Sequence, residues 1–139
     1  MRFTVFLLLQ RAQLLRENIV IHRVRFENLC AGGRSFGPYH FDEELIEPTC
    51  MAGLINFGGT LYFSNPAEEK GRTHMTLKKS TDSGEHWAVD TLIWPGPAAY
   101  SLVVPLSANS TGGAVGVVYE RGFQGAEENM SIAIVATGA

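Results

Sequence analysis

The sequence predicts an all-β protein built from many short strands. Short apolar runs recur through the 139 residues, and several of them alternate apolar and polar side chains, as half-buried strands do. Glycine, with 15 residues, recurs between these runs and favours turns. A sustained helical period is absent except over residues 10–18, which could also form a helix.

The expected strands, in chain order, are residues 3–9, 19–26, 53–57, 61–64, 73–79, 87–93, 101–106, 115–120 and 131–136. Gly58 and Gly59 separate the third and fourth of these runs, which is a hairpin signal. The fifth and sixth are expected to pair across the turn at residues 81–86. Loops are expected at residues 29–38, 108–113 and 122–129.

Eight or nine short strands at this spacing are typical of a sandwich, a barrel or the blades of a propeller. A propeller blade carries four strands, and closure takes about four to eight blades. The chain therefore supplies material for about two blades. If the fold is a propeller, we expect the chain to be an incomplete one.

Composition and charge argue against several classes of protein. The formal net charge is −3 and there is no basic cluster, so the chain lacks the cations with which a nucleic-acid binder neutralises phosphates. Cys30 and Cys50 are either two unrelated thiols or one disulfide, and they are too few for a zinc site. The four histidines are scattered without an H-x-x-x-H pair and are expected to be surface or packing residues.

The beginning of the chain superficially resembles a signal peptide. Its apolar run, residues 5–9, is too short for a signal core, and no A-x-A-like cleavage site follows it. The run is also far too short to span a bilayer. We interpret it as part of a buried strand and expect that Met1 need not be the biological start.

Residues 80–87 have the pattern S-x-D-x-G-x-x-W. Asp82 can accept hydrogen bonds from backbone N–H groups of its own turn, and Gly84 can supply a positive φ. Trp87 can bury its ring where the next strand starts. The pattern resembles the Asp box of sialidases and related propellers, in which Ser80 and these three residues would build a hairpin and do no chemistry. The alternative is an ordinary polar turn before a tryptophan.

A longer series of segments resembles the C-terminal region of animal lysosomal exo-α-sialidases (neuraminidases). Residues 41–48 are similar to that family's F-D-x-E-L-x-x-P, residues 63–67 to its F-S-N-P-A, and residues 92–101 to its L-W-P-G-P-x-x-Y-S. Residues 118–122 and 131–133 are similar to its L-Y-E-K-G segment and its I-S-V-A ending. The match is strong over residues 41–139 and weaker over residues 1–40.

The resemblance implies that residues 1–139 are the C-terminal portion of a single sialidase propeller domain. The fold would be a partial six-bladed β-propeller, with about two to two and a half blades of four-stranded antiparallel sheet. The implied activity is retaining hydrolysis of terminal α-linked sialic acid from glycoproteins, oligosaccharides and gangliosides.

Sialic acid carries a carboxylate on its anomeric carbon, and a guanidinium group matches a carboxylate in geometry as well as in charge. Sialidases use three arginines for this purpose. By position, Arg72 resembles the third of them, and Arg11, in an R-x-Q context, resembles the second. The alternative for each is a solvent-exposed arginine at the end of a strand.

By the same resemblance, Tyr100 is the nucleophile and Glu120 braces one of the carboxylate-binding arginines. A neutral phenol avoids the repulsion between a second carboxylate and that of the substrate. It is a weak nucleophile, however, until a base takes its proton. The alternatives are a buried aromatic residue at Tyr100 and an ordinary solvent-facing carboxylate at Glu120.

Three groups of the family have no counterpart in the sequence: the acid/base aspartate, the first arginine and the glutamate that activates the tyrosine. We therefore expect the isolated chain to be incomplete and inactive. The alternative is a non-enzymatic truncated propeller that binds glycan or a partner protein, since an open sheet edge invites pairing with another chain.

The resemblance implies no cofactor and no metal, because arginines hold the substrate charge. It implies sialylated glycans as ligands, a protective carboxypeptidase as a partner and a lysosomal location. Membrane-associated and cytoplasmic locations are the alternatives, and membrane association is left open. Sequons at Asn109 and Asn129 weakly favour a secretory or lysosomal route.

Overall fold

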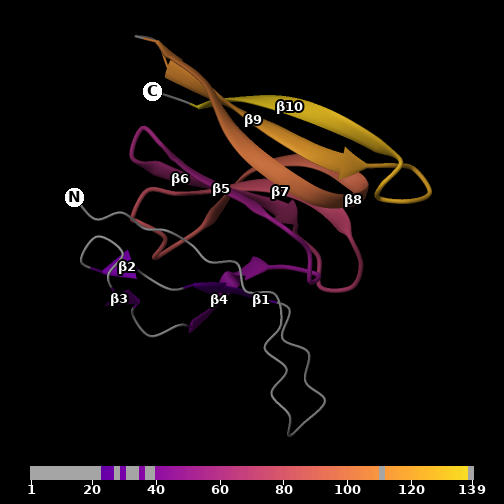
Figure 1. The fold of residues 1–139 in the computed structure, drawn as a ribbon, viewed down its shortest axis with the longest axis horizontal. Helices are drawn as coiled ribbons and strands as arrows, with labels where there is room; N and C mark the ends of the chain where they lie inside the picture. The colour runs from indigo at the N-terminus through magenta and orange to yellow at the C-terminus, as the bar shows by residue number, and fades with distance from the viewer. Residues whose placement is uncertain (1–22, 27–28, 31–34, 37–39, 110–111, 138–139) are drawn as a thin grey trace, which may run out of the picture.

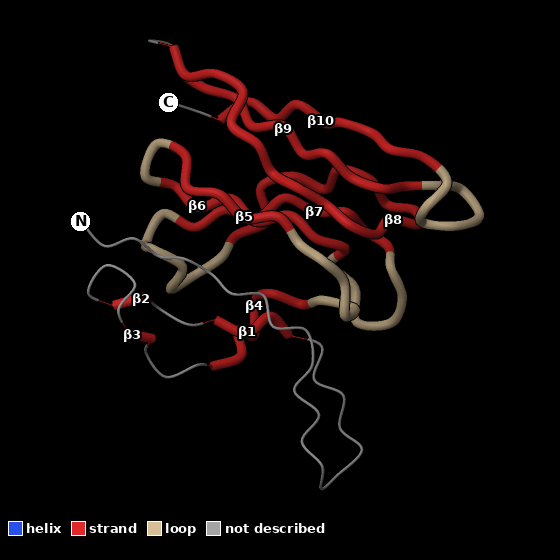
Figure 2. The backbone as a smooth tube through the Cα atoms, viewed as in Figure 1, coloured by secondary structure: helices blue, strands red, loops and turns tan. Residues whose placement is uncertain are grey.

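The computed structural model describes residues 23–26, 29–30, 35–36, 40–109 and 112–137, and every regular element in these ranges is a strand (Figure 2). The prediction of an all-β fold is therefore confirmed for this part of the chain. Within it, no helix has the length and apolar character needed to cross a membrane. The expected strand at residues 3–9 and the alternative helix at residues 10–18 lie outside the described residues.

Six strands form one antiparallel sheet in the order β10-β9-β8-β7-β6-β5. They are β5 (Gly53–Phe57), β6 (Thr60–Pro66), β7 (Thr73–Ser80), β8 (Ala88–Asn109), β9 (Gly112–Arg121) and β10 (Asn129–Thr137). Each strand from β6 to β10 pairs with the one before it in the chain, so the sheet is a series of hairpins. The sheet is strongly curled, so that β9 and β10 lie over β5, β6 and β7 (Figure 1).

The longest strand, β8, pairs with a different strand along each half. Its first half, up to Pro97, pairs with β7, and its second half, from Ala98 onwards, pairs with β9. The prediction of separate strands at residues 87–93 and 101–106 is therefore wrong. The φ that proline imposes is compatible with extended backbone, so the W-P-G-P segment does not interrupt the strand.

Two small sheets accompany the large one. In one of them β1 (Arg23–Phe26) pairs with β4 (His40–Ile46), and in the other β2 (Leu29–Cys30) pairs with β3 (Ser35–Phe36). The expected loop at residues 29–38 thus contains two short strands. The strand β4 was not predicted, because its three consecutive acidic residues, 42–44, mask the apolar alternation typical of a strand.

The strand β6 is buried on both faces and forms the middle of the fold. Toward β4, Phe63 packs with Leu45 and Trp87, and its ring meets the indole edge-on at a centroid distance of 5.8 Å. Toward the far half of the curled sheet, Tyr62 belongs to a second cluster that includes Val117. These two clusters hold β5, β6 and β7 between β4 on one side and the β8–β10 hairpins on the other.

The second half of β8 crosses directly over β5 and β6. A Cβ atom on Gly53 would lie 2.5 Å from the backbone nitrogen of Val103, so the two backbones approach as closely as glycine alone permits. Beside this contact, the buried Ser101 hydroxyl donates to the carbonyl oxygen of Ser64 at 2.9 Å, and the Ser64 hydroxyl donates to Ser101 Oγ at 2.8 Å. Together these contacts fix how far the sheet curls.

Replacing Gly53 with alanine is expected to destabilise the fold by about 1–3 kcal/mol, because the new methyl group meets backbone that cannot rotate away. Gly125→Ala is the matched control, since its Cβ would find its nearest neighbour at an ordinary 3.8 Å, and its effect should stay within about 1 kcal/mol. Denaturant unfolding of both variants measures the difference. Equal midpoints for the two variants would show that the crossing is not tight.

Candidate functional site

A β-bulge in the middle of β8 presents Tyr100 to solvent. Ala98 lies opposite Arg121 and Ser101 opposite Tyr119, so β8 carries one more residue than β9 at this point. A bulge of this kind leaves one residue out of the ladder and redirects its side chain. Tyr100 is 41% exposed, whereas Ala99 before it is fully buried. Tyr100 is therefore not a buried packing aromatic.

Glu120 on β9 lies opposite the bulge. Its Oε2 atom accepts a hydrogen bond from the backbone N–H of Tyr100 at 3.1 Å. A bulge disturbs the regular backbone pairing, and a carboxylate is a strong acceptor for the displaced N–H. The described partner of Glu120 is thus the backbone of Tyr100, so its bracing of an arginine stays a prediction.

Arg72 stands immediately before β7, and its guanidinium group reaches the bulge. Its Cζ atom lies 5.4 Å from the centroid of the Tyr100 ring, within the range of a cation–π contact. Its Nη2 atom donates to the carbonyl oxygen of Thr49 at 3.4 Å, and its Nη1 atom lies 3.5 Å from Glu127 Oε1. A backbone hydrogen bond joins Arg72 to β8, because the N–H of Ala98 donates to the carbonyl oxygen of Arg72 at 2.9 Å.

The turn after β4 holds the Arg72 guanidinium group through a backbone carbonyl. Thr49 has a positive φ of 59°, which is uncommon for a β-branched residue, and its carbonyl group accepts from Arg72. The carboxylate of Glu47 accepts the N–H of Cys50 at 2.9 Å and closes the turn. Cys50 is a free, fully buried thiol. Burial raises the pKa of this thiol to about 11, although the positive charge of Arg72 opposes the rise.

Three predicted site residues, Arg72, Tyr100 and Glu120, are therefore brought together, and the roles assigned to them stay predictions. Arg11 lies outside the described residues. Sequence reasoning missed Thr49 and Glu127, which both contact Arg72. No local pattern marks them, since Glu127 lies 55 positions from Arg72 in a loop. Among the residues that the structure describes, no three His, Cys, Asp or Glu side chains gather as a group that could hold a metal ion.

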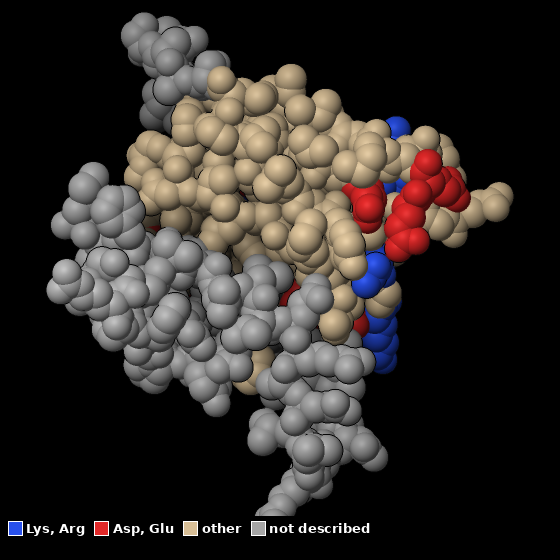
Figure 3. Space-filling model, in the orientation of Figure 1, with Lys and Arg blue, Asp and Glu red and all other residues tan. Residues whose placement is uncertain are grey.

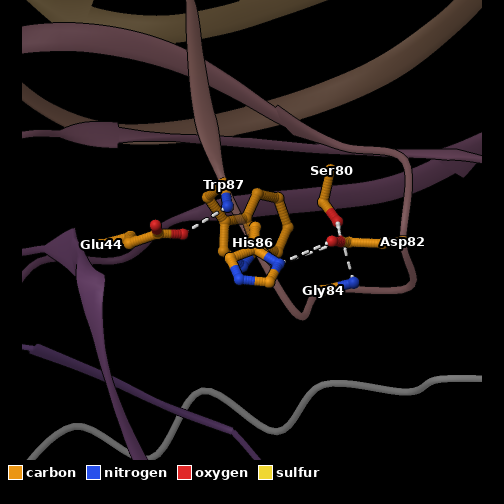
Figure 4. Close-up of polar contacts among 6 residues, drawn as sticks. All are labelled: Glu44, Ser80, Asp82, Gly84, His86 and Trp87. Carbon is orange, nitrogen blue, oxygen red and sulfur yellow. Dashed lines mark hydrogen bonds and ion pairs between the residues drawn. The ribbon is translucent and has the colours of Figure 1, made fainter.

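The turn at residues 80–87 is a separate, structural feature (Figure 4). The Ser80 hydroxyl donates to Asp82 Oδ1 at 2.7 Å and accepts the N–H of Gly84 at 2.8 Å. Asp82 also accepts the N–H of His86 at 3.0 Å, and Gly84 has a positive φ of 91°. Trp87 is buried, and its backbone N–H donates to the carboxylate of Glu44 on β4, so the turn helps to hold β4 against the sheet.

An ion pair on this turn gives a pH-dependent contribution to stability. His86 Nδ1 lies 2.8 Å from Asp82 Oδ2. This hydrogen bond raises the pKa of His86, while the Ser80 hydroxyl and then the backbone N–H of His86 hold the pKa of Asp82 well below its usual range. The stabilisation of the fold by ionised Asp82 is fully present above the ordinary pKa of aspartate, and it is lost as the pH falls through the lowered pKa of Asp82. The stabilisation by protonated His86 is present below its ordinary pKa of 6.5 and is lost as the pH rises through the raised value.

Asp82→Asn is expected to lower the pKa of His86 toward 6.5, because the partner that raises it loses its charge. An NMR titration of the His86 ring in both chains measures this. Glu85→Gln, which removes a more weakly coupled carboxylate, should lower the pKa much less. The same His86 pKa in the native chain and in Asp82→Asn would contradict the ion pair.

The chain was compared with family models, with curated proteins and with solved structures. No family model matches the chain. In sequence, the chain is 33% identical over 101 residues to a sialidase of Micromonospora viridifaciens, which covers 66% of this chain and 15% of that protein. In structure, it is similar to a Hadza microbial sialidase, with a TM-score of 0.57 and 20% identity, over 86% of this chain and 26% of that one. The chain thus spans a small part of each relative. The structural likeness shows the fold, and the sequence likeness supports the sialidase family.

Proposed function

We propose that the chain is part of an exo-α-sialidase that removes terminal α-linked sialic acid from glycoproteins, oligosaccharides and gangliosides. The convergence of Arg72, Tyr100 and Glu120, from three separate segments, on one bulge of β8 carries this proposal. The sialidase of Micromonospora viridifaciens supports it at the level of the family. A closer likeness to the animal lysosomal enzymes is part of the proposal and rests on the segments quoted above.

In the proposed reaction, Arg72 binds the sialic acid carboxylate through its terminal nitrogens. A base takes the proton of the Tyr100 hydroxyl as the Tyr100 oxygen attacks the anomeric carbon, the bond to the leaving oxygen breaks, and an acid/base group gives that oxygen a proton. Water then gives a proton to the acid/base group and attacks the same carbon, and the Tyr100 oxygen leaves and takes its proton back from the base, which gives sialic acid with retained configuration. The hydrogen bond from the Tyr100 N–H to Glu120 holds the nucleophile's backbone at the bulge.

The site needs an acid/base group and a base for Tyr100, and the sequence match supplies neither. We therefore expect the 139-residue chain to bind sialosides without hydrolysing them. The rival is a non-enzymatic truncated propeller whose own function is to bind glycan or a partner protein.

The proposed architecture is part of a six-bladed propeller, with the turn at residues 80–87 as its Asp box. The four antiparallel strands β5 to β8 have the strand number of one blade, and β8 continues into a second set. The outer face of β8 and β10 exposes Leu102, Ile132 and Ile134, so it is suited to contact with a further layer. A lysosomal location and a protective carboxypeptidase as partner complete the proposal.

Binding of a methyl α-sialoside, measured by ligand-observed NMR, tests the proposal. Arg72→Met is expected to weaken binding by about tenfold or more, because a charge-assisted hydrogen bond is lost. Tyr100→Phe should change the affinity less than about threefold, since its hydroxyl group acts in bond formation rather than in holding the carboxylate.

Arg121→Met is the matched control, because Arg121 stacks on Trp94 at 4.5 Å and has no place in the proposed site. The methyl ester of the same ligand, which lacks the charge, should bind to the native chain about tenfold or more weakly than the acid. If the native chain and Arg72→Met bind the sialoside with equal affinity, or if the native chain binds the acid and the ester equally, Arg72 does not bind the carboxylate. Absence of any sialoside binding would favour the partner-binding rival.

A further inference from the structure

The loop between β9 and β10, residues 122–128, brings a carboxylate of the chain itself to Arg72. Glu127 Oε1 lies 3.5 Å from Arg72 Nη1, while Arg72 Nη2 is engaged with the Thr49 carbonyl. The Arg72 side chain is 37% exposed and that of Glu127 is 70% exposed. In Figure 3, acidic and basic side chains lie next to one another at the end of the molecule where this loop projects. The two side chains thus form a solvent-facing ion pair at the proposed carboxylate site.

The position of Glu127 is set by the fold of its loop. The carboxylate of the neighbouring Glu128 accepts the backbone N–H groups of Phe123, Gln124 and Gly125 at 3.0, 2.9 and 2.7 Å. The N–H of Gly122 donates to the carbonyl of Pro97 at 3.0 Å and ties the loop to β8. These bonds order the backbone on both sides of Glu127, so little more than the glutamate side chain has to move to free Arg72.

A carboxylate at this place is a chemical equivalent of the carboxylate of the proposed ligand. The pair is exposed and its distance is longer than that of a good charge-assisted hydrogen bond, so it is weak and readily exchanged. We propose that Glu127 is a specificity-determining residue, an internal carboxylate that occupies Arg72 until a ligand carboxylate replaces it. A ligand that lacks a carboxylate gains nothing from Arg72 by displacing Glu127. The identity of the ligand as sialic acid rests on the proposed function.

The reactivity of Arg72 toward phenylglyoxal, followed by peptide mass spectrometry, tests the inference on the full chain. In Glu127→Gln the rate of Arg72 modification should rise about two- to fivefold, as expected when an exposed ion pair is lost. Glu85→Gln is the matched control, since it removes the same charge from an exposed glutamate of the distant turn at residues 80–87, and it should leave the rate unchanged. N-acetylneuraminic acid should protect Arg72 at a lower concentration in Glu127→Gln than in the native chain.

An unchanged or lower rate in Glu127→Gln would overturn the inference, because Glu127 would then not occupy Arg72. A rise in both variants would also overturn it, because a general charge effect would explain it. Protection by N-acetylneuraminic acid decides the proposed function separately. If Arg72 reacts faster in Glu127→Gln but N-acetylneuraminic acid protects it in neither chain, Glu127 occupies Arg72 and sialic acid is not the ligand. If N-acetylneuraminic acid protects Arg72 but the two chains react at equal rates, sialic acid is the ligand and Glu127 does not occupy Arg72.

Discussion

The close crossing of β8 over β5 and β6 determines how the sheet curls and where the candidate site lies. At Gly53 the two backbones meet without room for a Cβ atom, and the buried pair Ser64 and Ser101 satisfies its polar groups across the same gap. Because β8 is one continuous strand, this contact fixes both of its halves at once. Since the first half pairs with β7 and the second half with β9, the crossing determines how the two parts of the sheet face each other.

The candidate site lies where β8 changes partners. The residues before the bulge follow β7, which begins beside Arg72, and the residues after it follow β9, which ends beside Glu120. Tyr100 lies between them, with its ring toward the Arg72 guanidinium and its N–H on the Glu120 carboxylate. The site therefore depends on strand pairing more than on direct contacts among its side chains. A substitution of Gly53, which contacts none of the three site residues, is therefore expected to disturb the site through β8.

Local patterns in the sequence predicted most of the hairpins and little of their assembly. The run at residues 53–57 and the glycine pair after it gave β5 and its turn, because both depend on neighbouring residues alone. The bulge was missed, although two consecutive small residues, Ala98 and Ala99, interrupt the alternation there. The contacts of Thr49 and Glu127 with Arg72 arise from tertiary structure, so no spacing could reveal them. The resemblance to sialidases placed Arg72, Tyr100 and Glu120 in one site, whereas Arg11 lies outside the described residues.

Amide chemical-shift mapping of the ¹⁵N-labelled chain with N-acetylneuraminic acid measures whether the three segments that carry Arg72, Tyr100 and Glu120 form one binding surface. We expect the largest shifts at Arg72, Tyr100 and Glu120, together with Thr49 and Cys50 in the turn after β4. The turn at residues 80–87, which is structural, should remain unchanged. Shifts that are scattered over the sheet, or confined to one of these segments, would show that the three segments do not form one binding site.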